Sequence, residues 1–446
     1  MESLRGAPRL LRRTIPAAVA LACTSTAFGF APQSAGTDKP GLLERDHPLA
    51  AWQAITTHLG EKGLQLELFY TLDLLANVDG GIEREFAAIG NLDLLAAADL
   101  EALMSWRDTW LVLYAIGNHG EISPAVGDFQ AVSNIEAPAT VKLFEAWIEK
   151  ELAGRHLSVL AGLYDVNSEF DVIPSAAVFL NGSQGMGAEL GNSGRNGPST
   201  FPTTSLGLRL DYQPAGSFYA RAVVADGVPG SLDDDKRTQI ELDGDDGLFL
   251  LAEAGYINIT SERLRGRTRR YADEVPLEDR RYGFFGKFAL GVWHYTGEAQ
   301  DLRNPATLRR SSPGLYALAE QRVFYEPDDP MQGLSLFARA GAADGRTQPI
   351  DGYLGAGAVY RGCLPSRHED ELGLAVAAAH FGSSYRSALS SGGEWDEWEI
   401  DVELTYRWRI SPWLSLQPNV QRVFHPGGDP SVEDATVVGL RMLASF

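Results

Sequence analysis

From Leu64 onward, the chain alternates between apolar and polar residues in many short stretches. Residues 64–70, 157–163 and 206–212 each place apolar side chains at every second position. A period of two is typical of a β-strand with one apolar and one polar face. Clusters of turn and loop residues separate these stretches. The sequence therefore predicts an all-β fold for most of the chain.

The clearest alternation lies near the end of the chain. One face of this expected strand carries Trp398, Ile400, Val402, Leu404, Tyr406 and Trp408, and the other carries Glu397, Glu399, Asp401, Glu403, Thr405 and Arg407. A tryptophan at each end of an apolar stripe about ten residues long is typical of a lipid-facing strand with aromatic girdles. A strand of a soluble sandwich, with its polar row in water, would show the same pattern.

The last residues of the chain favour the membrane interpretation. Residues 438–446 alternate again and stop on an aromatic residue, Phe446, at the end of an apolar face. About 14 to 18 candidate strands follow Gly63, and because bacterial single-chain barrels prefer even numbers, the central expectation is sixteen. We therefore expect residues 64–446 to form a transmembrane antiparallel β-barrel.

The N-terminal residues have two different patterns. Residues 1–30 combine arginines, a short apolar stretch and small residues, which predicts a signal peptide for export. A lipoprotein signal ending at Cys23 is the alternative. Residues 31–63 are expected to hold a short helix, because Leu49, Trp52, Ile55 and Leu59 recur at steps of three and four. This helix either caps the barrel or packs against its rim.

Composition narrows the class of protein. The chain has 446 residues, a formal net charge of -21 and a mean hydropathy of -0.14. An acidic surplus of this size argues against nucleic acid as a partner. No run of about 18 apolar residues follows the signal, so only a closed barrel could cross a membrane. Removal of the signal leaves Cys363 alone, which excludes an internal disulfide.

Motifs of enzymes and metal sites are missing from the sequence. It has no His-Glu-x-x-His, Gly-x-Ser-x-Gly or Gly-x-x-x-x-Gly-Lys pattern, so we expect no catalytic activity, no cofactor and no bound metal. The acidic stretches 233–235 and 243–246 could bind a divalent cation, but they lack the spacing of a calcium loop. A solvated loop is the favoured interpretation.

Several segments together resemble the carbohydrate-selective porins of the OprB type. They are GDFQ at 127–130, SNIEA at 133–137, LFEAWIEK at 143–150, GLYDVNSEF at 162–170, FLN at 179–181, GLSLFAR at 333–339, TYR at 405–407 and PWLSLQP at 412–418, followed by Gln421. Their shared order along one chain makes the resemblance specific. One departure is that residues 49–53, Leu-Ala-Ala-Trp-Gln, replace the Trp-Gly-Gly element of the family.

The resemblance implies a sixteen-stranded barrel with loops folded inward and passive diffusion of glucose and related sugars across the bacterial outer membrane. The candidate pore-lining residues are Gln130, Asn134, Glu136, Asp165, Asn167, Glu169, Asn181, Arg339 and Arg407. Asp165, Asn167 and Glu169 would project to one side of an extended chain, or would cap a turn if a strand ends there. Such polar groups replace part of a sugar's hydration without holding it.

The expected partners are small sugars and outer-membrane lipid, and the expected state is a monomer, with a trimer as the alternative. Three other functions remain open from the sequence. A general diffusion porin, either non-selective or cation-preferring, would share the fold. A secreted lectin-like protein would be soluble without detergent. An outer-membrane lipase or protease would need a nucleophile constellation, for which the sequence gives no pattern.

Overall fold

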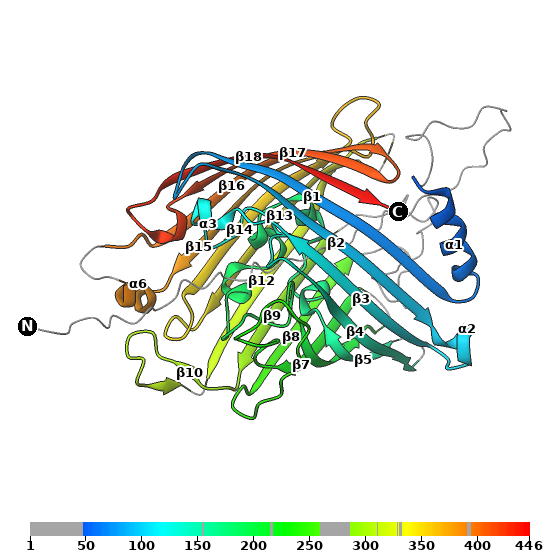
Figure 1. Ribbon diagram of the computed structural model, residues 1–446, viewed down its shortest axis with the longest axis horizontal. Helices are drawn as coiled ribbons and strands as arrows, with labels where there is room; N and C mark the ends of the chain where they lie inside the picture. The colour runs from blue at the N-terminus through cyan, green and yellow to red at the C-terminus, as the bar shows by residue number, and fades with distance from the viewer. Residues whose placement is uncertain are drawn as a thin grey trace, which may run out of the picture.

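One closed β-barrel makes up most of the protein (Figure 1). The computed structural model describes residues 48–446, except residues 154–155, 215–216, 259–285, 310, 328, 330–331 and 390–393. Sixteen strands form the barrel, in which β1 (Leu64–Gly81) pairs with both β2 (Glu85–Asp99) and β18 (Glu433–Ser445). All neighbouring strands are antiparallel. The expected sixteen-stranded antiparallel barrel is confirmed.

The other elements follow in chain order. The remaining barrel strands are β3 (Thr109–His119), β4 (Thr140–Leu152), β5 (Leu157–Tyr164), β6 (Ser205–Tyr212), β7 (Phe218–Asp226), β8 (Leu248–Asn258), β9 (Gly286–Tyr295), β12 (Ser312–Tyr325), β13 (Gly333–Ala343), β14 (Ile350–Arg361), β15 (Glu371–Phe381), β16 (Trp398–Ser411) and β17 (Leu414–Phe424). A separate small sheet joins β10 (Ala299–Gln300) and β11 (Leu308–Arg309). The helices are α1 (Ala50–Gly60), α2 (Leu100–Met104), α3 (Ser123–Val126), α4 (Gly182–Gly185), α5 (Ala188–Gly191) and α6 (Ser383–Leu389), with 3-10 turns η3 (Val166–Ser168), η4 (Pro174–Val178) and η8 (Pro426–Gly428).

The outer surface of the barrel is apolar. Along β16 the odd-numbered residues from 399 to 405 are buried inside, whereas Leu404 and Trp408 are 50% and 42% exposed on the outside. Leu94 of β2, Leu290 of β9 and Leu374 of β15 are likewise exposed. An apolar surface that extends around a barrel requires lipid to cover it. The alternation in the sequence thus predicted correctly which face of β16 points outward.

The two ends of the barrel differ in their connections. At one end, called the turn end, short connections join β2 to β3, β4 to β5 and β16 to β17, and α1 and the C-terminus lie there as well (Figure 1). At the other end, called the loop end, residues 120–139 and 165–204 make long connections. The expected signal peptide lies outside the described residues. No helix in the described part of the chain is long and apolar enough to span a membrane.

Candidate functional site

Two chain segments fold from the loop end into the barrel. Inner loop A is residues 120–139, between β3 and β4, and inner loop B is residues 165–204, between β5 and β6. Both contain buried polar and buried apolar side chains, and short helical turns shape them. An inward-folded loop narrows the path through a barrel, so these two loops define the candidate site.

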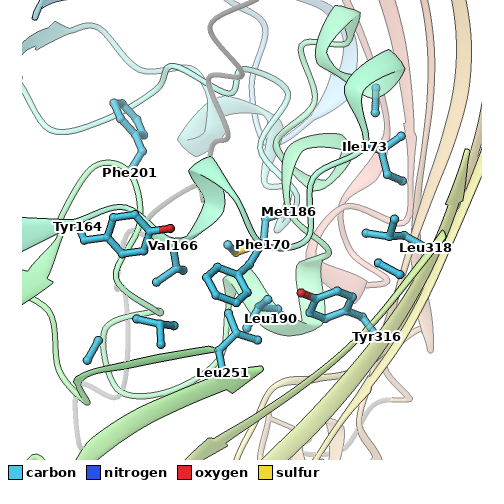
Figure 2. Close-up of a cluster of buried hydrophobic side chains, with 14 of the residues drawn as sticks. Tyr164, Val166, Phe170, Ile173, Met186, Leu190, Phe201, Leu251, Tyr316 and Leu318 are labelled. Carbon is cyan, nitrogen blue, oxygen red and sulfur yellow. The ribbon is translucent and has the colours of Figure 1, made fainter. Parts of the chain in front are cut away.

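Apolar side chains hold inner loop B against the barrel wall. Figure 2 shows Phe170 and Leu190 of the loop close to Leu251 of β8 and Tyr316 of β12. Each of these four side chains is at most 2% exposed. Because burying apolar surface contributes about 25 cal/mol per Å², this cluster fixes the loop on the side of β8 and β12.

Acidic side chains of the wall bind the backbone of both inner loops. Glu399 of β16 accepts hydrogen bonds from the N–H groups of Phe129 (2.9 Å) and Gln130 (3.0 Å) in inner loop A. Glu403 of the same strand accepts hydrogen bonds at 2.7 and 3.0 Å from the N–H groups of residues 180–181 in inner loop B. Buried backbone N–H groups need acceptors, and these two side chains supply them. The polar row of β16 therefore anchors both loops.

Arginines of strands on both sides of β16 also bind the inner loops. Arg339 of β13 lies 3.0 Å from the carboxylate of Asp171 and donates a hydrogen bond to the carbonyl oxygen of Ser183 (3.0 Å). Arg441 of β18 donates to the side-chain oxygen of Asn134 (2.6 Å). Arg441 also pairs with buried Asp73 (2.6 Å). Each of these buried charges thus has a charged partner, which is the condition under which buried charge is tolerated. Arg339, one of the candidate residues, thus holds inner loop B.

Three other candidate residues are buried in contacts that shape the inner loops. Gln130 donates from Nε2 to a carbonyl oxygen of β16 (3.2 Å), and Asn134 donates from Nδ2 to the carbonyl oxygen of Phe179 (3.1 Å). Asn181 caps α4 by accepting a hydrogen bond from the N–H group of Ser183 (2.9 Å). At 0 to 5% exposure, these side chains have little surface left for a solute.

The residues from Asp165 to Glu169 form a turn and not an extended row. The strand β5 ends at Tyr164, and Asp165 caps η3 by accepting a hydrogen bond from the N–H group of Asn167 (2.9 Å). Asn167 in turn donates from Nδ2 to the carbonyl oxygen of Phe170 (3.0 Å). Of the two arrangements that the sequence left open, the structure therefore shows the turn cap and not the extended row, because the side chain of Asp165 satisfies the turn that its own strand end requires.

Glu169 and Arg407 keep part of their side chains exposed. The Glu169 side chain is 15% exposed and lies 2.8 Å from Nε of Arg209, which also binds Glu149 at 2.7 Å. The Arg407 side chain is 25% exposed and pairs with Glu371 of β15. These two candidates can contact a solute while their partners fix their orientation.

Glu136 is the remaining candidate, and it lies half-buried in inner loop A. Its carboxylate accepts hydrogen bonds from the N–H groups of Ile122 (3.1 Å) and Ser123 (3.2 Å). Burial, together with the nearby charge of Asp128, raises the pKa of Glu136 to about 7. In inner loop B, burial likewise raises the pKa of Glu189 to about 8. The inner loops thus carry less negative charge near neutral pH than their sequence suggests.

The structure gives no sign of a metal centre in the regions it describes. Among these residues, no group of three or more His, Cys, Asp or Glu side chains is placed to hold a metal ion. In the acidic stretches 233–235 and 243–246, the backbone oxygen of Asp235 accepts a hydrogen bond from Lys142 (3.0 Å), and Asp246 pairs with Arg195 (3.0 Å).

Sequence reasoning missed the wall residues that hold the loops. Glu399, Glu403, Arg209 and Arg441 were not among the candidates, although each lies on the polar face of a strand with an apolar opposite face. That alternation marks them as inward-facing. It does not reveal that a loop distant in sequence covers them.

Comparison with known proteins agrees with this architecture. The model of the carbohydrate-selective porin, OprB family, matches residues 83–446. Porin B of Pseudomonas aeruginosa is 24% identical over 434 residues, which cover 89% of this chain and 91% of that protein. The high-pH structure of Pseudomonas putida OprB has a TM-score of 0.76 and 22% identity, covering 91% of this chain and 100% of that one. The low-pH structure of Pseudomonas putida OprB has a TM-score of 0.57 and 19% identity, covering 90% and 99%.

These matches cover nearly the whole barrel. At these identities the solved structures establish the shared fold alone, whereas the family model extends over most of the chain. The family consists of outer-membrane channels of Gram-negative bacteria. The chain therefore belongs to the carbohydrate-selective porin family of the OprB type.

Proposed function

We propose that this porin lets small, glucose-like carbohydrates diffuse passively through the barrel, as a monomer and without catalysis or a cofactor. The observation that carries the proposal is the pair of inner loops, which occupy part of the barrel interior and are bound there by wall carboxylates and arginines. A solute must pass through the space that they leave. Fixed loops favour a narrow, constant path over a wide, adaptable one.

The proposed lining consists of Glu136, Glu169 and Arg407, whose side chains are partly exposed. Carboxylate oxygens accept hydrogen bonds from sugar hydroxyls, and a guanidinium donates to them. Each of these side chains already has a protein partner, so it binds a sugar weakly enough for release. The buried candidates Gln130, Asn134, Asp165, Asn167, Asn181 and Arg339 act by shaping the inner loops.

A general, cation-preferring diffusion porin is the competing function. The formal net charge of -21 favours it, because acidic loops concentrate cations near a pore. Charges farther than about 8 to 10 Å from the path are screened at physiological salt. The preference therefore depends on the lining residues and not on the total charge.

The test is single-channel conductance of the detergent-purified, signal-processed protein in a planar bilayer, with glucose and longer sugars titrated against the current. A saturable reduction of the current by glucose supports a sugar-preferring pore. Conductance steps that no sugar changes would mean a general porin. A Glu169→Gln variant should weaken the effect of glucose, whereas the exposed control Glu433→Gln at the loop end should leave it unchanged.

The monomer is tested separately. Exposed leucines and valines lie on β2, β6, β9, β14 and β17, so apolar surface extends around the barrel and favours lipid contact on all sides. Light scattering of the detergent-solubilised protein should give the mass of one chain after subtraction of the detergent. Three times that mass would support the trimer instead.

A further inference from the structure

The inner face of β16 changes its charge along the barrel axis. Near the loop end it carries Glu399, Asp401 and Glu403, which are 0 to 1% exposed beneath the inner loops. Near the turn end it carries Arg407 and Arg409, whose side chains are 25% and 19% exposed. At the turn end, therefore, this wall presents arginines to the lumen, although the chain as a whole is acidic.

The strand register places a third arginine beside them. Arg361 of β14 lies directly opposite Glu371 of β15, and Glu371 lies directly opposite Arg407 of β16. Residues directly opposite each other in a sheet share a face. Because Arg407 follows the buried inward-facing row of β16, Arg361 faces the lumen too.

A fourth inward-facing arginine lies on β12, and two small residues of β13 separate it from Arg361. Arg322 of β12 is opposite Ser335 of β13, and Ser335 is opposite Val359 of β14, two residues before Arg361. Arg322 therefore shares the inner face, and only Ser335 and Gly333 of β13 separate it from Arg361. Small side chains at these positions leave room between the two guanidinium groups.

We call Arg322, Arg361, Arg407 and Arg409 the turn-end arginines. The positive charge of Arg361 interacts electrostatically with Arg322 and with Arg409. Like charges placed together cost free energy unless an anion lies among them.

Acidic residues pair with two of the turn-end arginines. Glu371 pairs with Arg407, and Glu369, which is 60% exposed, lies 3.4 Å from Arg409. Glu320, near Arg322, is 2% exposed and accepts a hydrogen bond from inner loop B. Among the described residues Arg361 has no ion pair, and its Nε atom is buried without an acceptor. Arg361 is thus the member best placed to bind an added anion.

We propose that the turn-end arginines form a binding site for a small carboxylate- or phosphate-bearing solute, reached from the periplasm. Short turns of outer-membrane barrels face the periplasm, which places the site there. Guanidinium groups bind carboxylate and phosphate through two parallel hydrogen bonds. A bound anion lies in the path of solutes leaving the inner loops and reduces their flow. The inference rests on the proposed function, since it needs an open lumen.

The experiment adds gluconate, and separately inorganic phosphate, to one side of a bilayer that holds single channels. The orientation of each channel is read at the end of the recording, when a membrane-impermeant thiol reagent labels the free Cys363 in the β14–β15 turn from one side. Periplasmic gluconate should reduce the current in a saturable way. From the loop-end side the same concentration should have a much smaller effect.

The variants distinguish a specific anion site from a general electrostatic attraction of anions to the pore. Arg361→Gln should raise the half-blocking concentration of gluconate at least fivefold. Arg361→Lys should have an intermediate effect, because lysine keeps the positive charge but cannot make two parallel hydrogen bonds to a carboxylate. Arg84→Gln is the matched control, because Arg84 is 72% exposed at the loop end. Heat-modifiable migration on gels shows that each variant is folded.

The outcomes are distinct for the two proposals. Equal block from both sides, or an unchanged half-blocking concentration in both Arg361→Gln and Arg409→Gln, would overturn the anion site. Periplasmic block by gluconate in a channel that ignores glucose would support the site and contradict the sugar preference. A current that glucose reduces and gluconate does not would support the sugar preference and contradict the anion site.

Discussion

Replacing Glu399 by glutamine should release inner loop A. The Glu399 side chain is 0% exposed and accepts hydrogen bonds from the N–H groups of Phe129, Gln130 and Gly427, the last at 2.6 Å. Glutamine keeps the shape and one acceptor oxygen, but its amide nitrogen then faces these donors. Leaving a buried N–H group without an acceptor costs about 1 to 3 kcal/mol. A loss of about 3 kcal/mol would raise the released population of the loop about 100-fold.

The assay is single-channel conductance together with the swelling rate of liposomes in glucose and in longer sugars. We expect larger or more variable conductance steps and faster entry of the longer sugars. Glu397→Gln is the control, because Glu397 precedes β16 and pairs with Arg386 while 58% exposed, and exposed pairs contribute about 0 to 1 kcal/mol. If a folded Glu399→Gln protein had the conductance and size limit of the parent, the carboxylate would not be the anchor.

Three further changes test the packing of the inner loops. Arg339→Met leaves the buried carboxylate of Asp171 unpaired and should destabilise the folded barrel by about 3 to 5 kcal/mol in thermal unfolding, whereas Arg346→Met, at an exposed ion pair, should leave stability nearly unchanged. In Gly341→Ala the new Cβ would lie 1.7 Å from Oε1 of buried Glu189, so the variant should lose about 1 to 3 kcal/mol; adding Glu189→Ala should restore most of the loss. The pKa of Glu136 is raised from 4.5 to about 7, so ionising it in the folded state is unfavourable. Stability should therefore fall as pH rises from about 4.5 through 7, and this slope should diminish in Glu136→Gln; equal slopes in both proteins would contradict the raised pKa.

The fold was predictable because each strand of such a barrel has one face in contact with lipid and the other in contact with a polar interior. Lipid outside and polar groups inside impose a period of two, and β16 shows it over its length from Trp398 to Trp408. The number of strands followed from the spacing of such stretches. The bounds of inner loop B were less accessible, since η3, η4, α4 and α5 are too short to give a periodic signal.

The candidate site was predictable only in part. Several of the segments that resemble the family lie in inner loops A and B, and most of the polar candidates in them shape the loops themselves. Asp165 illustrates the reason: a polar residue at the end of a strand serves equally well as a lining group or as a turn cap. Only the position of the chain relative to the distant wall decides between these roles. Glu399 anchors inner loop A across a separation of 270 residues in sequence.

The total charge of the chain is a poor guide to the charge that a solute meets. Of the residues that make the chain acidic, Glu399, Asp401 and Glu403 are buried beneath the inner loops, and two of them bind loop N–H groups. The backbone of a loop inside a barrel loses water and needs acceptors, and one carboxylate provides several. The acidity of this wall is therefore largely structural. Ion and solute preference then depends on the charges that line the proposed path, which are Glu136, Glu169 and the turn-end arginines. Substitutions there should shift the reversal potential more than substitutions in the acidic stretches 233–235 and 243–246.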